Sequence, residues 1–298
     1  MFLARTLKLI VLNPKSICIV GIGLMGASFA MALRGNPEIG KIIGISRSDE
    51  TKRKALQRGI VDEATIDLAE GVRDADIVVL CTPVRLLIEQ IAELGALCKP
   101  GCVITDMGST KTKVVQAMNA LPPHLFAVGS HPMCGKETAG IDVAEATLYQ
   151  NAPWILTRTE RTDEASFNLI KGLAESVGAK TREIDVARHD ALLSFASHLP
   201  YMLSTAMVAT TDAYAINNNA PDVWQVMAGG YRDTSRVAAS DVTMWLDILL
   251  TNPDAILGAV RDFQFELDQF AAMLERRDEA GLKALMMQAA KARKAHYE

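Results

Sequence analysis

The fold of this chain is decided by residues 17–26, which read Ile-Cys-Ile-Val-Gly-Ile-Gly-Leu-Met-Gly. A short apolar run that ends in glycine predicts a buried strand. The glycines at 21, 23 and 26 form a Gly-x-Gly-x-x-Gly pattern, and residues 24–33 have the composition of a helix. Between a strand and a helix, this pattern is typical of a turn that binds the pyrophosphate of a dinucleotide.

The turn supplies the first expected cofactor contacts. Gly21 permits a tight turn, Gly23 lets the backbone approach a pyrophosphate at the helix N-terminus, and Gly26 lets helix and strand pack closely. A glycine-rich turn without function is the alternative, and the strand–helix context counts against it. The expected cofactor residues here are Gly21, Ile22, Gly23, Leu24, Met25 and Gly26.

Strands and helices alternate along the first half of the chain. Apolar runs at 41–46, 76–81, 102–106, 125–130, 154–157 and 180–184 predict further strands, with helices at 49–57, 84–97, 110–120 and 163–177. Such a pattern predicts a parallel sheet covered on both faces, in a doubly wound α/β fold. Beyond residue 185 only helices are expected, at 187–216, 222–229, 241–250, 254–275 and 279–296. We therefore place a dinucleotide-binding (Rossmann-type) domain over 1–186 and an all-helical domain over 187–298.

The end of the second predicted strand bears on the choice of cofactor. An NAD site usually has an acidic residue here, which binds the ribose 2′-hydroxyl. This chain has Ser46, Arg47 and Ser48 instead. Hydroxyl and guanidinium groups suit a 2′-phosphate, so the sequence favours NADP over NAD. The alternative is that Arg47 is a solvated surface arginine.

Composition argues against several classes of protein. The 298 residues carry 31 Lys and Arg against 35 Asp and Glu, a formal net charge of −4, without a basic block, so nucleic acid is not expected as a partner. The five cysteines lack a Cys-x-x-Cys spacing, so neither disulfides nor a metal site are expected, and the cytoplasm is the expected location. The uncharged stretches 16–33 and 191–211 have lengths close to a membrane span. The glycines of the first stretch, and the hydroxyl groups and Pro200 of the second, favour buried elements of a soluble protein over membrane spans.

Polar side chains follow the predicted strands. Asp-Met-Gly-Ser-Thr-Lys at 106–111 follows the fourth strand, and Ser-His-Pro-Met-Cys-Gly at 130–135 follows the fifth. Ligands in such folds bind at the carboxyl ends of the strands. His131 therefore has the chemistry and the place of a general base, with the Ser109 loop beside it.

These blocks resemble the prephenate/arogenate dehydrogenase family of tyrosine biosynthesis. The resemblance rests on residues 21–26, 81–83, 105–111, 130–135, 197–200 and 229–236, and extends from about residue 16 to the C-terminus. It implies an oxidative decarboxylation in which His131 takes a proton from a ring hydroxyl and Ser109 hydrogen-bonds both groups. It also adds Cys81, Thr82, Pro83 and Gly108 to the expected cofactor contacts.

The resemblance further implies a substrate site in the helical half. Arg236 matches an arginine that binds the ring carboxylate, and Trp245 matches an aromatic residue of the pocket. The spacing of Arg232 and Arg236 by itself also fits an alternative, in which both lie on a solvated helix face and Asp233 pairs with one of them. The expected substrate residues are Arg236, Arg232, Trp245, Tyr201, Lys136, Glu137, Gly229, His198 and Asp233. His189, near the start of the first C-terminal helix, is expected to be structural.

Two departures from the family pattern favour arogenate over prephenate. Tyr201 stands where many members that use prephenate have histidine. Lys136, followed by Glu137, stands where many members have threonine after the glycine. A lost histidine and a nearby acid suit a substrate with an ammonium group, whereas Lys136 argues for a keto acid. We expect an NADP-dependent arogenate dehydrogenase, with a prephenate or dual-specificity cyclohexadienyl dehydrogenase as the alternative. More distant alternatives are a β-hydroxyacid dehydrogenase, a pyrroline carboxylate reductase or a non-enzymatic NADP-binding regulator.

A homodimer through the helical half is also expected. Ile256, Val260, Phe263, Leu267, Phe270 and Leu274 are spaced 4-3-4-3-4, which gives an apolar seam along one helix. Together with segment 191–211, this is more apolar surface than a five-helix domain hides alone.

Overall fold

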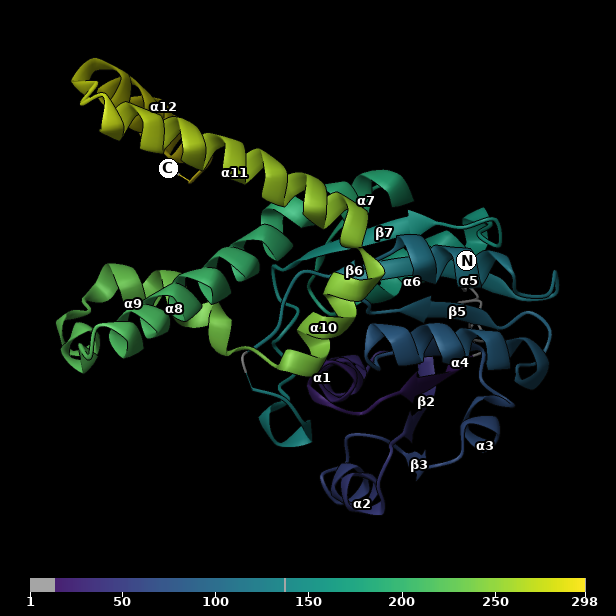
Figure 1. The fold of residues 1–298 in the computed structure, drawn as a ribbon. Coiled ribbons are helices and arrows are strands. Elements are labelled where there is room, and N and C mark those ends of the chain that lie inside the picture. The colour runs from purple at the N-terminus through teal and green to yellow at the C-terminus, as the bar shows by residue number, and fades with distance from the viewer. Residues whose placement is uncertain (1–13, 137, 298) are drawn as a thin grey trace, which may run out of the picture.

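The computed structural model describes residues 14–136 and 138–297, which form a sheet domain and a helical domain (Figure 1). Within these residues the sheet runs in the order β3-β2-β1-β4-β5-β6-β7-β8. Its strands are β1 (Lys15–Val20), β2 (Ile39–Ile45), β3 (Glu63–Thr65), β4 (Ile77–Leu80), β5 (Val103–Asp106), β6 (Phe126–Pro132), β7 (Pro153–Arg158) and β8 (Lys180–Glu183). Its helices are α1 (Leu24–Leu33), α2 (Asp49–Gln57), α3 (Leu68–Val72), α4 (Val84–Leu97), α5 (Thr112–Asn119), η1 (Ile141–Val143) and α6 (Glu164–Ser176).

Helices cover both faces of the sheet, which confirms the doubly wound α/β prediction. Phe29 of α1 and Phe167 of α6 belong to the core on one face. Leu87 of α4 and Met118 of α5 belong to the core on the other face. The central strands are apolar where both of their faces are buried, from Ile17 to Val20 in β1 and throughout β4.

Two features of the sheet differ from the prediction. Strand β7 pairs with β6 in the antiparallel direction, so β7 and β8 run against the rest of the sheet. Between β6 and β7 the chain has only the short η1, and an antiparallel return needs no crossover helix. The short β3 and α3 were not predicted, because elements of three and five residues are too short to show a strand or helix pattern.

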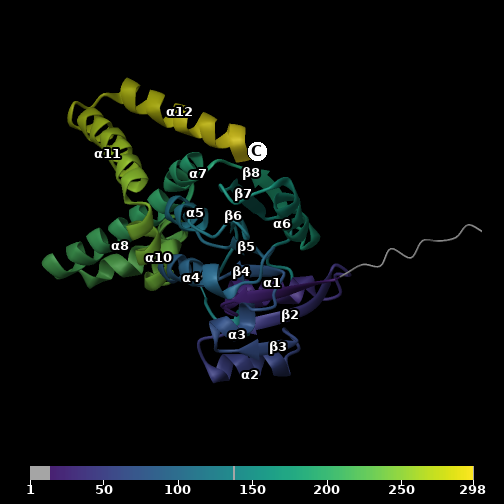
Figure 2. The same cartoon turned by 90° about the vertical axis from the view of Figure 1, so that its right-hand side faces the viewer.

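The helical domain begins directly after β8. It contains α7 (Val186–Leu193), the π-helical segment η2 (Ser194–His198), α8 (Leu199–Asn217), η3 (Pro221–Val226), α9 (Gly229–Ser235), η4 (Arg236–Ala239), α10 (Val242–Thr251), α11 (Pro253–Glu275) and α12 (Glu279–Tyr297). Figures 1 and 2 show α8 with α9, and α11 with α12, as two arms that extend away from the sheet. The domain boundary at 186 stays a prediction. In the structure β8 ends at Glu183 and α7 begins at Val186.

Three details of the helical domain correct the sequence prediction. The helix expected over 187–216 contains the wide turn η2, just before Pro200, which has no N–H to donate and whose ring crowds the preceding turn. The helix expected over 222–229 is instead the 3₁₀ segment η3, and α9 begins at Gly229. The apolar seam of α11 is divided, because Ile256 is buried within the chain whereas Leu267 and Leu274 are each 56% exposed.

The helical domain docks on the sheet domain through α7 and α10. Asp190 of α7 accepts backbone hydrogen bonds at the start of α5, and Asp247 of α10 pairs with Arg85 of α4 at 2.5 Å. In the described part of the chain, Val186–Asn217 is the stretch that is long and apolar enough to span a membrane by length and composition. Asp190 near its start is buried and α7 packs against α5, whereas most of the apolar stretch is not buried within the described part of the chain.

Candidate functional site

The glycine turn lies where the sequence placed it, between β1 and α1. Gly21 has φ +98°, a left-handed conformation, and a Cβ there would lie 3.0 Å from the backbone of Cys81. A Cβ on Gly26 would lie 2.2 Å from the carbonyl oxygen of Gly21, so helix and strand touch through this glycine. Gly23 is the N-cap of α1, with no side-chain cap and no atom within 4 Å of its Cβ position. These residues fit a pyrophosphate, because open space adjoins uncapped N–H groups.

The end of β2 carries the residues expected to select the cofactor. Ser46 is buried, and its Oγ accepts a hydrogen bond from the backbone N–H of Ser48 at 3.2 Å. Ser48 caps α2 by accepting from the N–H of Thr51. Arg47 is exposed and has no ion pair within the described residues. The guanidinium of Arg47 is therefore available to an anion at this edge.

The loop after β5 is built on a buried ion pair. Lys111 and Asp106 are both 0% exposed, and the Lys111 ammonium contacts the Asp106 carboxylate. The same ammonium donates to the carbonyl oxygens of Gly108 at 2.9 Å and Thr110 at 3.1 Å. These contacts fix the turn on which Ser109 stands. Within the described residues Ser109 makes no hydrogen bond to His131, so its expected role toward a substrate hydroxyl stays a prediction.

His131 lies at the carboxyl end of β6 and is 8% exposed. Its Nδ1 is 3.0 Å from Nε2 of His189, and Nδ1 of His189 is 2.8 Å from Oδ1 of Asp190. Burial lowers the pKa of His131 well below its ordinary value, and the nearby His189 and Lys111 lower it further. The imidazole of His131 is therefore neutral at physiological pH, as a proton acceptor must be.

An aromatic cluster stands beside this row of polar side chains. The rings of Tyr201 and Trp245 are stacked, with centroids 3.7 Å apart, and His198 meets Trp245 edge-on. The amide nitrogen of Asn252 connects the two groups, because it donates to the carbonyl oxygen of Asp190 at 2.9 Å and lies 3.4 Å from Nδ1 of His198. Trp245 Nε1 is buried without a hydrogen-bond partner in the described part of the chain. The structure thus brings three expected substrate residues to the helical side of His131.

The arginines of α9 and η4 are not joined directly to His131. Arg232, Asp233, Arg236 and Gly229 are exposed. The end of α9 is held to α8, because the Ser204 hydroxyl donates to the carbonyl oxygen of Thr234, and Ser204 lies three residues from Tyr201. The segment η4, which begins at Arg236, also packs on α8, the helix that carries Tyr201 of the aromatic cluster.

Two further expected residues follow His131 in the loop after β6. Lys136 pairs with Glu145 at 3.1 Å and donates to the carbonyl oxygen of Val143 at 3.1 Å. Its charge is therefore balanced within the sheet domain. Glu137 lies outside the described residues.

Remaining cofactor candidates line the ends of β4 and β5. Thr82 donates to the side-chain oxygen of Gln90 at 2.6 Å, and Pro83 is the N-cap of α4. Cys81 is half-buried against Met107, and Gly108 is buried with its N–H on Asp106. With the glycine turn and Ser46, these residues share the carboxyl edge of the parallel strands, where this fold binds nucleotides.

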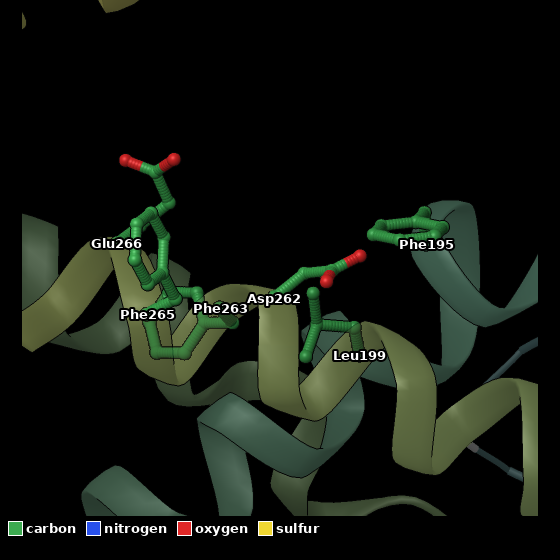
Figure 3. A pocket seen from close by; sticks show the side chains of 6 residues that line it. All are labelled: Phe195, Leu199, Asp262, Phe263, Phe265 and Glu266. Carbon is green, nitrogen blue, oxygen red and sulfur yellow. The ribbon is translucent and has the colours of Figure 1, made fainter.

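A separate hollow of about 480 Å³ lies in the helical domain (Figure 3). It is lined by Phe195 and Leu199 on one side and by Asp262, Phe263, Phe265 and Glu266 of α11 on the other. None of the expected cofactor or catalytic residues belongs to it. The strand edge remains the candidate site, because the titratable and glycine features lie there.

Family models match both parts of this architecture. The model described as prephenate dehydrogenase, nucleotide-binding domain, matches residues 29–183, and the one described as prephenate dehydrogenase, dimerization domain, matches residues 185–288. This chain belongs to the prephenate dehydrogenase family. The resemblance drawn from the sequence is therefore confirmed, and the protein is a dehydrogenase of aromatic amino-acid biosynthesis. The second match supports the expected homodimer.

Relatives in this family differ in the substrate that their names give. Prephenate dehydrogenase of Bacillus subtilis is 36% identical over 271 residues, which is 90% of this chain and 72% of that protein. The structure of Aquifex aeolicus prephenate dehydrogenase with hydroxyphenyl propionate and NAD+ has a TM-score of 0.87 and 32% identity, covering 96% and 99% of the two chains. Synechocystis arogenate dehydrogenase has a TM-score of 0.80 and 32% identity, covering 94% and 99%.

Sequence reasoning missed the residues that hold the site together. His189 was expected to be structural, yet it contacts His131 directly. Asp190, Asn252 and the Lys111–Asp106 pair were not singled out. The available signal was the adjacent pair His189 and Asp190. The pair lies in the first helix after the last strand, and such a helix packs next to the strand ends.

Proposed function

We propose that this chain catalyses the oxidative decarboxylation of L-arogenate to L-tyrosine with NADP. The observation that carries the proposal is a buried histidine, His131, at the strand edge that also carries the glycine turn, and burial lowers the pKa of its imidazole. His131 takes the proton of the ring hydroxyl, hydride leaves the same carbon, carbon dioxide departs and the ring becomes aromatic. The proton then returns to the phenolate oxygen. A bound NADP supplies the hydride acceptor.

The support for arogenate comes from the residues that surround the substrate side chain. Tyr201 is stacked on Trp245, so this position offers an aromatic wall and no imidazole to a keto acid. Lys136, the residue that favoured prephenate, is paired with Glu145. This pairing weakens the argument for prephenate, because a paired ammonium group attracts the carboxylate of a keto acid less strongly. Prephenate, or both substrates, remains the alternative.

A matrix of initial rates tests the proposal. The protein is assayed with arogenate and with prephenate, each with NADP and with NAD, by the absorbance of the reduced nicotinamide. We expect the highest kcat/KM with arogenate and NADP. A higher kcat/KM with prephenate overturns the substrate, and no turnover with either substrate overturns the function.

NADP is expected to be preferred through Arg47. A charge-assisted contact with the 2′-phosphate contributes roughly 1–3 kcal/mol, or about 5- to 150-fold in kcat/KM. The double variant Ser46→Asp/Arg47→Ala should erase or invert this preference. The matched control is Arg53→Ala, because Arg53 of α2 is also an exposed arginine. An unchanged ratio of kcat/KM for NADP and NAD in the double variant would remove Arg47 from cofactor choice.

Arg236 is expected to act mainly in substrate binding. A carboxylate against the aromatic cluster needs a cation, and truncating that cation leaves the charge unpaired. Arg236→Ala should therefore raise KM by the equivalent of roughly 2–5 kcal/mol, with little change in cofactor affinity. Arg232→Ala should cost less, because a carboxylate nearer solvent is better screened. Steady-state kinetics of the two variants give the ranking, and the opposite ranking means that the two arginines exchange roles.

We also propose a cytoplasmic homodimer. The five cysteines are free thiols, as expected in a reducing compartment. Exposed Phe265 and Leu267 on α11 and Phe195 on η2 supply apolar surface for a second copy of the chain.

A further inference from the structure

Behind His131, a second histidine and an aspartate form a hydrogen-bonded row. The row runs from Nδ1 of His131 to Nε2 of His189 over 3.0 Å, and from Nδ1 of His189 to Oδ1 of Asp190 over 2.8 Å. His189 is fully buried and Asp190 is 3% exposed. The row crosses from β6 to α7, so it also joins the two domains.

Asp190 sets the direction of the hydrogen bonds. Its Oδ1 accepts from the backbone N–H of Lys111 at 2.7 Å, and its Oδ2 accepts from that of Thr112 at 2.8 Å. Burial by itself raises the pKa of the Asp190 carboxyl, but the hydrogen bonds from His189 and Thr112 outweigh burial and lower it. The carboxylate is therefore ionised at neutral pH and can only accept. It follows that Nδ1 of His189 carries a proton.

That proton fixes the next contact in the row. Burial lowers the pKa of His189 more than the Asp190 hydrogen bond raises it, so its ring is neutral and its Nε2 is bare. A bare Nε2 accepts, so Nδ1 of His131 must donate to it. His131 is also neutral, and its one ring proton lies on Nδ1. Its Nε2 lone pair is left for a substrate.

We propose that His189 and Asp190 are positioning residues that fix the tautomer of His131 with Nε2 free to accept a proton. The inference rests on the proposed role of His131 as the base. When Nε2 takes the hydroxyl proton, the imidazolium keeps its Nδ1–H on His189. The Asp190 carboxylate, at the end of the row, offsets the new positive charge. The row returns to its first state when Nε2 gives the proton to the product oxygen.

Two substitutions at His189 separate this role from packing. His189→Leu removes the acceptor, whereas His189→Gln can place an amide oxygen where Nε2 stands. We expect His189→Leu to lower kcat about 10²-fold, with little change in KM and in the Kd for NADP. His189→Gln should recover about tenfold of that loss, since it restores the acceptor for Nδ1 of His131. The control is His124→Leu, which removes an exposed histidine and should leave kcat unchanged.

A direct measurement of the tautomer decides the inference in the wild-type protein. In protein labelled with ¹⁵N-histidine, the ring nitrogen shifts of His131, assigned through His131→Asn, should show the proton on Nδ1 at neutral pH. A proton on Nε2, or full kcat in His189→Leu, overturns the inference. If His131→Asn itself keeps its activity, the role of His131 as the base fails, and the inference that rests on it fails as well. A proton on Nε2 with His131→Asn inactive instead overturns the inference alone. The wild-type spectrum stands even where His189→Leu does not fold.

Discussion

His131→Asn is expected to lose roughly 10²–10⁴ in turnover, the range that general base catalysis supplies. Asparagine can keep a hydrogen bond toward His189 but has no basic nitrogen at the position of Nε2. Binding should change little, because the substrate carboxylate and the dinucleotide have other partners. The measurement is kcat and KM for arogenate, with the Kd for NADP from a fluorescence titration. A large rise in KM with kcat unchanged would assign His131 to binding.

The same assignment fixes the pH dependence. The sequence alone predicts that turnover rises through an ionisation near neutral pH. Burial moves the pKa of His131 well below its ordinary value, and His189, Lys111 and His198 lower it further, against Asp190, which raises it. Turnover of the wild type should therefore stay level from about pH 8 to 6.5 and fall only at more acid pH, as Nε2 becomes protonated. A midpoint of the pH–turnover curve at or above about pH 6.5 would contradict a lowered pKa of His131.

Local signals in the sequence predicted the sheet domain well. The predicted bounds of α2 and α4 coincide with the structure, because Ser48 caps one helix and Pro83 precedes the other. The glycine turn also matched, since Gly21 and Gly26 meet steric demands that only glycine satisfies. Each of these features is set by residues close together in the chain. Local pattern does not predict features that depend on pairing between distant residues, such as the antiparallel direction of β7.

The candidate site shows the same division. His131 and the Ser109 loop could be named from the sequence because each directly follows a predicted strand, and His131 proves to be near the end of β6. The partnership of His131 with His189 spans 58 residues and depends on how α7 docks against α5. No spacing rule relates these positions. Burial, which lowers the pKa of His131, is likewise a property of that docking.

The buried pair of Lys111 and Asp106 gives the largest expected effect on stability. Lys111→Met should lower the free energy of unfolding by about 3–5 kcal/mol, because it leaves the Asp106 carboxylate buried and unpaired. Both side chains are fully buried, and Lys111 also donates to the carbonyl oxygens of Gly108 and Thr110. The measurement is denaturant unfolding at one fixed protein concentration, since association shifts the apparent stability. Activity should fall as well, because these contacts fix the Ser109 loop.

An exposed ion pair in the same domain provides the matched control. Lys99 pairs with Asp76 at 2.7 Å, but their side chains are 38% and 36% exposed. Lys99→Met should therefore cost less than about 1 kcal/mol. In the double variant Lys111→Met/Asp106→Asn, the orphaned charge is gone, so the loss should be smaller than the sum of the two single losses. One contradicting result is that Lys111→Met lowers the free energy of unfolding no more than Lys99→Met does. The other is that the losses of Lys111→Met and Asp106→Asn add in the double variant. Either result would show that the Lys111–Asp106 pair does not hold this loop. The geometry of Ser109 must then come from the docking of α7 and α10.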